Sequence, residues 1–325
     1  MKTPRVTARA HTNIALVKYW GKRDENLIIP MNGSLSLTLD EFYTETTVQF
    51  DSKQQTDHLI LDGVTQPTTR VTPFLDIIRN QAGITAGAVV TSTNHVPTAA
   101  GLASSASAYA ALAAAASKAA GLTLNRQALS RLARRGSGSA TRSVFGGFVE
   151  WQAGTNDATS YAVPIDEHPT WPIRMVTVVV DRAEKKIGSR AGMQTVVKTS
   201  PFYQEWVKKA QADLAAIKPA IAAHDIQQTG AIAESNAMAM HALNLTATPH
   251  FTYFTAGSLT AMHCVEELRA KGIPCYYTMD AGPNVKVLCE EQHVAAILTT
   301  LQAHFDKNDL LVAHPGLGVQ IIRED

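Results

Sequence analysis

The chain has 325 residues, of which 45% are hydrophobic and 18% charged, and its 29 Lys and Arg against 28 Asp and Glu leave a formal net charge of +1. This length suffices for two domains or one large α/β unit with a substantial core. The balanced charge and scattered basic residues exclude an extended nucleic-acid-binding face. Two basic pairs, Arg134-Arg135 and Lys185-Lys186, are better suited to a small phosphorylated ligand.

The cysteines indicate a reducing compartment. Cys264, Cys275 and Cys289 are odd in number and show no CxxC spacing, so neither a disulfide framework nor a zinc site is expected. The N-terminal residues lack an apolar signal region, and the longest apolar run, 108–116, is much shorter than a membrane span. We therefore expect a cytoplasmic protein with no membrane partner.

The first part of the chain opens on strands. Leu35, Leu37 and Leu39 alternate with polar residues, and 44–50 repeats this pattern, which predicts half-buried strands. The elements expected next are, in order, a strand at 58–61, a short helix at 73–81, a buried strand at 88–93, an alanine-rich helix at 101–120, a helix at 126–135, a Gly/Ser segment at 136–139 and a strand at 144–151.

A Pro- and Trp-rich stretch at 168–172 interrupts the pattern, so we expect two domains, 1–172 and 173–325. The second is predicted to contain a strand at 175–180, helical stretches near 190–218, 224–242 and 251–271, strands at 275–279 and 285–289, a helix at 291–305 and two short terminal strands. Helices and strands mix without strict βα alternation, which predicts an α+β fold. Residues 310–325 pack either with the second domain or back on the first.

Residues 97–107, Pro-Thr-Ala-Ala-Gly-Leu-Ala-Ser-Ser-Ala-Ser, form a turn of small residues before the alanine-rich helix. Gly101 lets the backbone approach a ligand closely, the serines offer hydroxyls, and the N–H groups of the first helical turn have no intrahelical acceptor. This combination is typical of a phosphate-binding turn. It is equally compatible with an ordinary helix N-terminus packed on a sheet.

Four further segments concentrate polar residues in apolar surroundings: 13–22, 136–142, 185–190 and 279–284. Together with the serine turn they supply cations, hydroxyls, flexible backbone and one acid, which is the inventory of a phosphoryl-transfer site. Taken singly, each residue has a structural alternative as a solvated, packing or helix-capping side chain.

The order of these segments carries a family resemblance. The sequences Val17-Lys-Tyr-Trp-Gly-Lys22, Pro97-Thr-Ala-Ala-Gly-Leu-Ala-Ser-Ser-Ala106, Gly138-Ser-Ala-Thr-Arg142 and Met279-Asp-Ala-Gly-Pro-Asn284 together resemble the diphosphomevalonate decarboxylases of the GHMP kinase superfamily, and the lysine-rich segment at 185–190 resembles their bacterial branch. The resemblance implies a GHMP kinase fold of the α+β class. Its N-terminal domain is expected to be like domain 2 of ribosomal protein S5, its C-terminal domain ferredoxin-like, and its active site to lie in the cleft between them.

The resemblance also implies a reaction. ATP phosphorylates the tertiary 3-hydroxyl of mevalonate 5-diphosphate, and loss of that phosphate together with the carboxylate gives isopentenyl diphosphate, ADP, phosphate and CO₂, a step of the mevalonate route to isoprenoids. The implied cofactors are ATP and Mg²⁺. The implied assembly is a homodimer whose partners are small-molecule substrates, with no nucleic acid.

The family's functional residues can be carried over where the motifs match. Asp280 is expected to orient or deprotonate the hydroxyl, Arg142 to hold the carboxylate, and Lys18 and Lys185 to lie near the acid and the phosphate chain. The expected substrate-binding residues are Tyr19, Lys22, Ser137, Ser139, Arg142, Ser189, Arg190 and Met193. The expected ATP-binding residues are Asn94, Pro97, Ala100, Gly101, Leu102, Ala103, Ser104, Ser105 and Ser107, with Ser104 or Ser105 reaching Mg²⁺. Ser107 stands where alanine is commoner, and its alternative is to face the sheet.

Two other functions fit the same motifs. A GHMP small-molecule kinase, such as a mevalonate-3-kinase, would use the same ATP turn and stop at the phosphate ester, but Asp280 and Arg142 argue against it. A catalytically silent ligand sensor would have no need for the acid, the lysines and the serines. Release of CO₂ distinguishes the decarboxylase from both.

Overall fold

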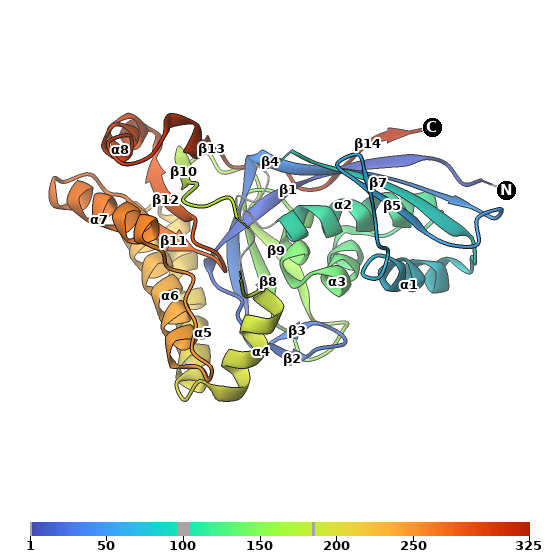
Figure 1. Cartoon of the computed structure of the whole chain (residues 1–325), viewed down its shortest axis with the longest axis horizontal. Helices are drawn as coiled ribbons and strands as arrows, with labels where there is room; N and C mark the ends of the chain where they lie inside the picture. The colour runs from blue at the N-terminus through green and yellow to red at the C-terminus, as the bar shows by residue number, and fades with distance from the viewer. Residues whose placement is uncertain (1, 96–103, 184–185) are drawn as a thin grey trace.

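The computed structural model describes residues 2–95, 104–183 and 186–325. Figure 1 shows an elongated molecule in which helices α4 to α8 gather at one end and α1 to α3 lie with a large sheet at the other. This arrangement confirms the α+β class. Among the described residues, no helix combines the length and the apolar character needed to cross a membrane.

The larger sheet has eight strands in the order β14-β1-β4-β7-β5-β6, with β8 pairing β4 and β9 pairing β8. All pairs are antiparallel except β5 with β7. The strands are β1 (Val6–Val17), β4 (Ser34–Asp51), β5 (His58–Leu61), β6 (Val64–Gln66), β7 (Gly87–His95), β8 (Phe148–Gln152), β9 (Tyr161–Asp166) and β14 (Gln320–Glu324), and a separate hairpin joins β2 (Lys22–Asp24) to β3 (Ile29–Pro30). β9 was not predicted from the sequence.

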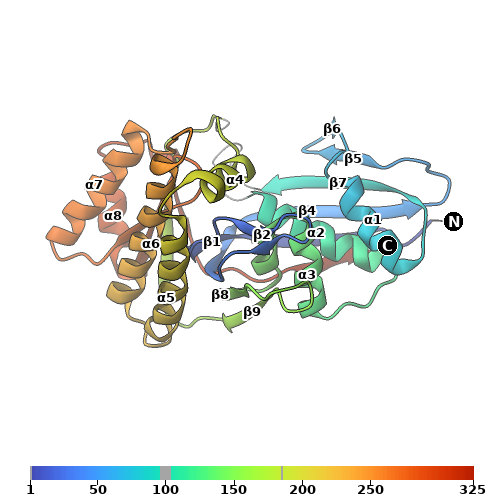
Figure 2. The same ribbon diagram turned by 90° about the horizontal axis from the view of Figure 1, so that it is seen from below.

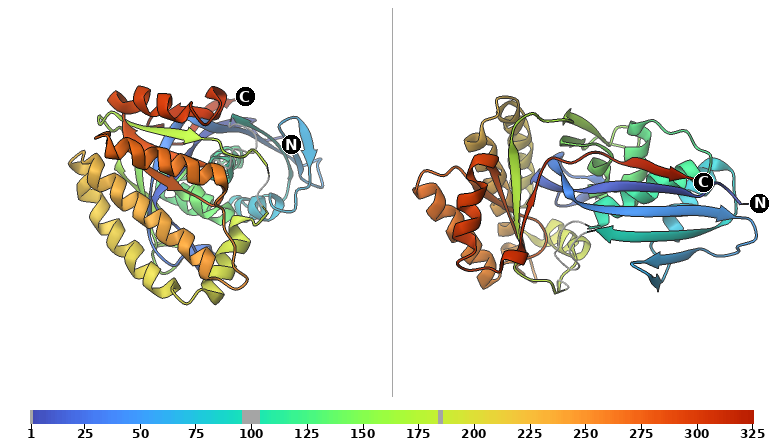
Figure 3. Two further views of the ribbon diagram at one scale, coloured as in Figure 1. Left: turned by 60° about the vertical axis from the view of Figure 1, so that its left-hand side comes forward. Right: turned by 90° about the horizontal axis from the view of Figure 1, so that it is seen from above.

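Three helices cover one face of this sheet (Figure 2): α1 (Thr72–Ala82), α2 (Ser104–Ala119) and α3 (Arg126–Gly136). All three were predicted, although residues 101–103 of the second lie outside the described part of the chain. The view from above shows no described helix over the opposite face (Figure 3). The strand predicted at 144–151 begins only at Phe148, because the 3₁₀ helix η1 (Gly138–Val144) occupies the preceding residues.

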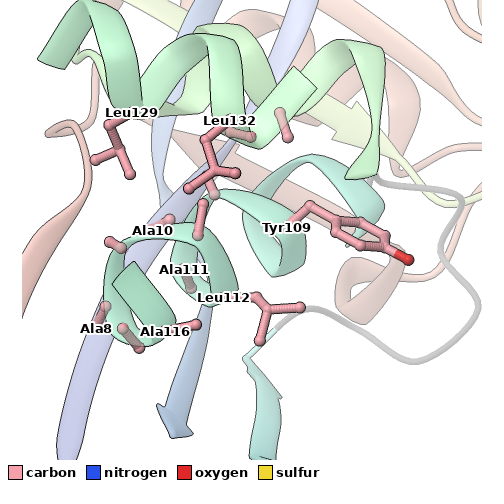
Figure 4. Close-up of a cluster of buried hydrophobic side chains, with 14 of the residues drawn as sticks. Ala8, Ala10, Tyr109, Ala111, Leu112, Ala116, Leu129 and Leu132 are labelled. Atoms are coloured by element: carbon pink, nitrogen blue, oxygen red, sulfur yellow. The ribbon is translucent and has the colours of Figure 1, made fainter. Parts of the chain in front are cut away.

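Alanine lets α2 lie close to the sheet. Ala111 and Ala116 are fully buried and belong to one cluster with Ala8 and Ala10 of β1 (Figure 4). Side chains of this size bring the helix backbone near the strands, while larger residues such as Leu132 of α3 fill the space behind it. The N-terminus of α2, where the predicted phosphate turn leads in, is therefore held against the sheet.

The second sheet has four antiparallel strands in the order β11-β12-β10-β13. They are β10 (Ile173–Val178), β11 (Tyr276–Met279), β12 (Val285–Glu290) and β13 (Leu310–Ala313), accompanied by α4 (Ser189–Thr199), α5 (Tyr203–Ala222), α6 (Ile226–Thr246), α7 (Ala256–Ala270), α8 (Val294–Leu301) and the short η2 (Glu291–His293) and η3 (Lys307–Asp309). The single helix predicted over 190–218 is wrong. It is divided between α4 and α5 at Ser200-Pro201, where Ser200 is extended (φ −75°, ψ 121°), because the residue before a proline disfavours helical dihedrals.

A shared core joins the two sheets. Leu35 and Leu37 of β4 pack in one cluster with Ile217 of α5 and Met175 of β10. The alternating leucines therefore face the core, as predicted. This packing places the end of β1 against α5 and α6, which Figure 1 shows crossing behind the second sheet. The chain's last strand, β14, pairs with β1.

Candidate active site

The polar centre of the molecule is an ion pair between Lys18 and Asp280. Lys18 directly follows β1 and is 2% exposed, and its Nζ donates a hydrogen bond to Oδ1 of Asp280 at 2.8 Å and another to the carbonyl of Ala15 at 2.7 Å. Asp280 directly follows β11 of the other sheet. Two segments that were predicted separately are therefore joined at their functional side chains.

A second ammonium group reinforces Asp280. Lys286 of β12 is 1% exposed, and its Nζ lies 4.0 Å from Oδ2 of Asp280. Burial raises the pKa of Asp280, but Lys18, Lys286 and Arg142 outweigh it and lower that pKa from 3.8 to about 2. The ionised carboxylate therefore stabilises the folded chain above its ordinary pKa, and this contribution is lost as the pH falls toward 2.

Lys286 was not predicted from the sequence as a site residue. The available signal was a lone lysine inside the apolar strand Val285-Lys-Val-Leu-Cys289, a few residues after the predicted acid. A lysine is almost never fully buried in a sheet unless it is paired. Its position in a strand that turns back from Asp280 was therefore informative.

The turn that carries Asp280 is fastened by its own motif. Oδ1 of Asn284 accepts hydrogen bonds from the backbone N–H groups of Val180 and Asp181 at 2.7 and 3.0 Å, and the hydroxyl of Ser258 donates to the carbonyl of Pro283 at 2.6 Å. Partners in α7 and in the segment after β10 thus fix the backbone after β11. The spacing of the acid and the asparagine in this motif has a structural reason.

Arg142 is the third buried cation of the site, after the two lysines. It is 2% exposed, its Nε donates to Oδ1 of Asn13 at 3.1 Å and to Oγ of Ser36 at 2.9 Å, and its Nη1 donates to Oγ of Ser34 at 2.5 Å. Burial lowers the pKa of Arg142 to about 10, and the charge of Asp280 opposes that shift. The guanidinium stays charged at neutral pH, and its orientation is set by three side chains of β1 and β4.

The polar residues that alternate with leucine in β4 do not lie on a solvent-exposed face, as the sequence pattern had suggested. Ser36 was predicted to lie on the polar face of a half-buried strand, yet it is fully buried, and so is Ser34. The leucines between them face the shared core, and the serines face Arg142. Both faces of this part of β4 are therefore inside the molecule, and the polar face binds a guanidinium instead of water.

A row of hydroxyls continues from Arg142 toward α2. Oγ of Ser105, in the first turn of α2, lies 3.3 Å from Oγ of Ser137, which lies 3.3 Å from Oγ of Ser139. The amide of Asn13 donates to the carbonyl of Ser139 at 3.0 Å. The serine turn and the Gly/Ser segment predicted from the sequence therefore meet at their hydroxyl groups.

The motif at 17–22 folds around Gly21. Its φ of +123° disfavours a side chain, and a Cβ there would lie 1.9 Å from the hydroxyl oxygen of Tyr203, which donates to the carbonyl of Trp20. Tyr19 stacks edge-on against Trp151 with ring centroids 4.8 Å apart. Burial raises the pKa of Tyr19, so its phenol stays protonated.

The remaining predicted residues fall into three groups. In the first group, Nζ of Lys22 lies 2.5 Å from Oε2 of Glu25. Ser189 and the exposed Arg190 are the first two residues of α4, and the half-buried Met193 lies in the same helix. In the second group, Oγ of Ser107 is buried and lies 2.8 Å from Oγ1 of Thr44, so this side chain faces the sheet. Asn94, near the end of β7, donates a hydrogen bond from Nδ2 to the carboxylate of Asp62. Ser104 is the first residue of α2, and the other predicted residues, Pro97, Ala100, Gly101, Leu102, Ala103 and Lys185, lie outside the described residues.

The interpretation of Arg134 as part of a phosphate-binding pair is wrong. Its side chain is completely buried, its Nε donates to the carbonyl of Leu27 at 3.0 Å, and its Nη atoms bind Asp157 and the carbonyl of Ser160. The guanidinium is thus enclosed by protein acceptors. It ties the β2–β3 hairpin to the turn between β8 and β9.

Two family models match consecutive parts of the chain. Residues 10–162 match the diphosphomevalonate decarboxylase-like N-terminal domain, and residues 175–315 match the mevalonate 5-diphosphate decarboxylase C-terminal domain. Human diphosphomevalonate decarboxylase is 37% identical over 326 residues, which cover 91% of this chain and 79% of the human protein. The chain belongs to the diphosphomevalonate decarboxylase family.

Solved structures of this family have the same fold. The mevalonate diphosphate decarboxylase of Staphylococcus aureus is 48% identical with a TM-score of 0.95, and the two chains cover 99% of each other. That of Enterococcus faecalis is 50% identical with a TM-score of 0.94, over 99% of this chain and 100% of that chain. Another structure, 50% identical with a TM-score of 0.95 and covering 99% of this chain and 100% of its own, is a complex with MVAPP, AMPPCP and magnesium. The GHMP kinase fold expected from the motifs is confirmed.

The two lysines that contact Asp280 are expected to determine how kcat/KM of this diphosphomevalonate decarboxylase family member depends on pH. In Lys18→Met, burial of Asp280 is opposed only by Lys286 and Arg142, so the pKa of Asp280 rises. In Lys286→Met the pKa rises less, because its ammonium lies at 4.0 Å and not 2.8 Å. The measurement is the pH at which kcat/KM is half-maximal on the acid side, and it is expected to rise in both variants, further in the first.

The matched control is Lys198→Met, which removes an exposed ammonium from α4 and is expected to leave the acid limb in place. A larger shift for Lys286→Met than for Lys18→Met contradicts the assigned distances, and an unmoved acid limb in both contradicts the electrostatic role of the lysines.

Proposed function

We propose that Asp280, Lys18 and Arg142 carry out in this chain the reaction of its family, the ATP-dependent conversion of mevalonate 5-diphosphate to isopentenyl diphosphate, ADP, phosphate and CO₂. The observation that carries the assignment of residues is one cluster in which an ionised, partly exposed acid meets two buried lysines and a buried arginine. An acid to receive a hydroxyl proton and a cation to hold a carboxylate are the two parts that this chemistry needs.

Asp280 is proposed to hold the 3-hydroxyl and receive its proton. The hydroxyl oxygen bonds to the γ-phosphorus of ATP, the bond from that phosphorus to ADP breaks, and the proton passes to the carboxylate. A carboxylate with a pKa of about 2 is a weak base, so its main contribution before bond formation is to orient the hydroxyl. A loose phosphoryl-transfer transition state demands little prior deprotonation of the nucleophile, so orientation accounts for most of the effect.

Arg142 is proposed to hold the substrate carboxylate until it leaves. Within the described part of the chain, its Nε and one Nη1 hydrogen are bound by protein side chains, whereas its Nη2 has no protein hydrogen-bond partner. The remaining N–H groups can donate to a carboxylate while the bound ones fix the plane of the guanidinium. After phosphorylation, the C–O bond to the new phosphate and the C–C bond to the carboxylate break, and a carbon–carbon double bond forms.

The hydroxyl row fits a magnesium ion that arrives with the nucleotide. Ser105, Ser137 and Ser139 offer neutral oxygen donors, which suit a hard cation that keeps several water ligands and shares phosphate oxygens. We propose that Ser105, with Ser104 beside it, holds Mg²⁺, whose charge offsets that of the nucleotide phosphates. The related complex with MVAPP, AMPPCP and magnesium supports this proposal.

The other residues predicted from the motifs keep their proposed roles. Tyr19, Lys22, Ser137, Ser139 and the α4 residues are proposed to bind the substrate diphosphate, and Lys185 the phosphate chain. Support comes from electrostatics, because the charges of Arg142 and Arg190 both act to lower the pKa of the half-buried Tyr19. The ATP-binding assignment of Asn94 and of residues 97–107 stays a prediction, with Ser107 contributing backbone and not its sheet-facing hydroxyl.

A kinase that stops at the phosphate ester is not favoured. The curated relatives, from human to Candida albicans, are named diphosphomevalonate decarboxylase.

We further propose that the chain acts as a homodimer in the cytoplasm and is divided into domains at 172/173. The family resemblance implies the dimer, and three buried thiols without disulfides agree with a reducing compartment. Light scattering on the purified protein measures its molar mass in solution, and the expected value for a dimer is twice the mass of one chain.

Asp280→Asn is expected to keep nucleotide binding and lose turnover. The amide still fills the position but accepts no proton, so kcat falls about 10²–10⁴-fold. The measurement is ATP-dependent release of CO₂ from mevalonate 5-diphosphate, with nucleotide affinity followed separately. Asp76→Asn, an exposed carboxylate on α1, is the matched control. A kcat near that of the unmodified enzyme in Asp280→Asn removes this acid from the chemistry.

Arg142→Lys is expected to lower CO₂ release about 10²–10³-fold, the size seen when one preorganised donor is lost. A single ammonium cannot bind Asn13, Ser36 and Ser34 and also hold a carboxylate. CO₂ and ADP are quantified together, with the exposed Arg5→Lys as control. Unchanged kinetics would show that the carboxylate is held elsewhere, and ADP formed without CO₂ would assign Arg142 to the second step.

A further inference from the structure

The backbone of Lys18 is held by two buried asparagines. β1 ends at Val17, so the peptide groups of Lys18 lie beyond its regular strand pairing. Oδ1 of Asn236, in α6, accepts a hydrogen bond from the backbone N–H of Lys18 at 2.8 Å, and Nδ2 of Asn32 donates to the carbonyl of Lys18 at 2.8 Å. Both asparagines are completely buried.

Asn236 is itself held in one orientation. Its Nδ2 donates to Oδ2 of Asp213, in α5, at 2.8 Å, and Nζ of Lys209 donates to both oxygens of that carboxylate at 3.0 and 2.9 Å. An asparagine between a backbone N–H and a carboxylate has a single arrangement that satisfies both, with its oxygen toward the N–H and its amine toward the carboxylate. The α5–α6 pair thus presents one fixed acceptor to the end of β1.

We propose that Asn236 is a positioning residue for Lys18, and that Asp213 sets its orientation. This inference rests on the proposed function, because it concerns the lysine that holds Asp280. Asn236 touches no reacting atom. It acts by fixing the backbone from which the Lys18 ammonium reaches Asp280, and a misplacement of about 1 Å in such a group costs about 10²-fold in rate.

The position of Asn236 explains why the second domain's helices matter to the site. Lys18 directly follows β1 of the larger sheet, and Asp280 directly follows β11 of the smaller sheet. α6 contacts β1, β11 and β12, and Lys286 lies within the last of these. The hydrogen bond that the Lys18 N–H donates to α6 therefore fixes the register between the acid and its ammonium partner.

A charge exchange tests the proposal. In Asn236→Asp two carboxylates face each other, and their repulsion displaces the oxygen that accepts from the Lys18 N–H, so kcat is expected to fall about ten- to a hundredfold with KM for ATP nearly unchanged. In the double variant Asn236→Asp/Asp213→Asn, the new carboxylate accepts from the Lys18 N–H and from the new amide. This variant is expected to recover kcat to within about threefold of the unmodified enzyme.

A second readout separates positioning from general damage. When Lys18 moves away, the pKa of Asp280 rises, so the acid limb of kcat/KM shifts to higher pH in Asn236→Asp and returns in the double variant. Asn236→Ala provides the same test if the aspartate variant does not fold. Asn244→Asp is the matched control, because it places the same group at another fully buried asparagine of α6.

The outcomes separate the two levels of the proposal. If the unmodified protein releases no CO₂ from mevalonate 5-diphosphate, the proposed function fails. If it is active but the Asn236 variants keep the unmodified acid limb and kcat, or the double variant regains nothing, the positioning role is overturned. Lowered kcat with a shifted acid limb in Asn236→Asp or Asn236→Ala, absent in Asn244→Asp and restored in the double variant, supports it.

Discussion

The ion pair between Lys18 and Asp280 is the interaction on which the rest of the structure depends. Each partner directly follows a strand of a different sheet, and each is enclosed by further polar contacts. Placing these charges away from water costs free energy, so the pair is maintained only because the shared core, the asparagines around Lys18 and the turn after β11 hold it in place. Folding thereby builds an ionised acid that faces the same interior as Arg142.

Much of this could be predicted from the sequence because the chemistry lies in short motifs. Each of the segments around Lys18, Ser105, Arg142 and Asp280 is one turn or one strand end, so residues that are neighbours in the sequence of a motif are also neighbours in the fold. The helices over the larger sheet followed from the alanine run and the leucine periodicity. The division of the helix at Ser200-Pro201 could have been predicted too, since the proline signals it.

The residues that hold those motifs in place could not be predicted, because tertiary contacts define them. Ser34 and Ser36 have the pattern of a solvated strand face, and only the fold places a guanidinium over them. Asn236 is 218 residues from Lys18 along the chain, and nothing in its helix distinguishes it from Asn244. The opposite error was made for Arg134: the Arg134-Arg135 pair suggested a bound ligand, but in the fold the Arg134 guanidinium binds protein carbonyls and Asp157.

The most direct test of the central claim is the ionisation of Asp280 in the resting enzyme. Protein labelled with ¹³C at aspartate carboxyl carbons can be titrated by NMR, with the Asp280 signal identified by its absence in Asp280→Asn. With Lys18 and Lys286 in contact, the signal is expected to stay that of a carboxylate from about pH 8 down to about pH 4, because its pKa is about 2. A titration midpoint at or above pH 4 would contradict an acid held ionised by the two lysines.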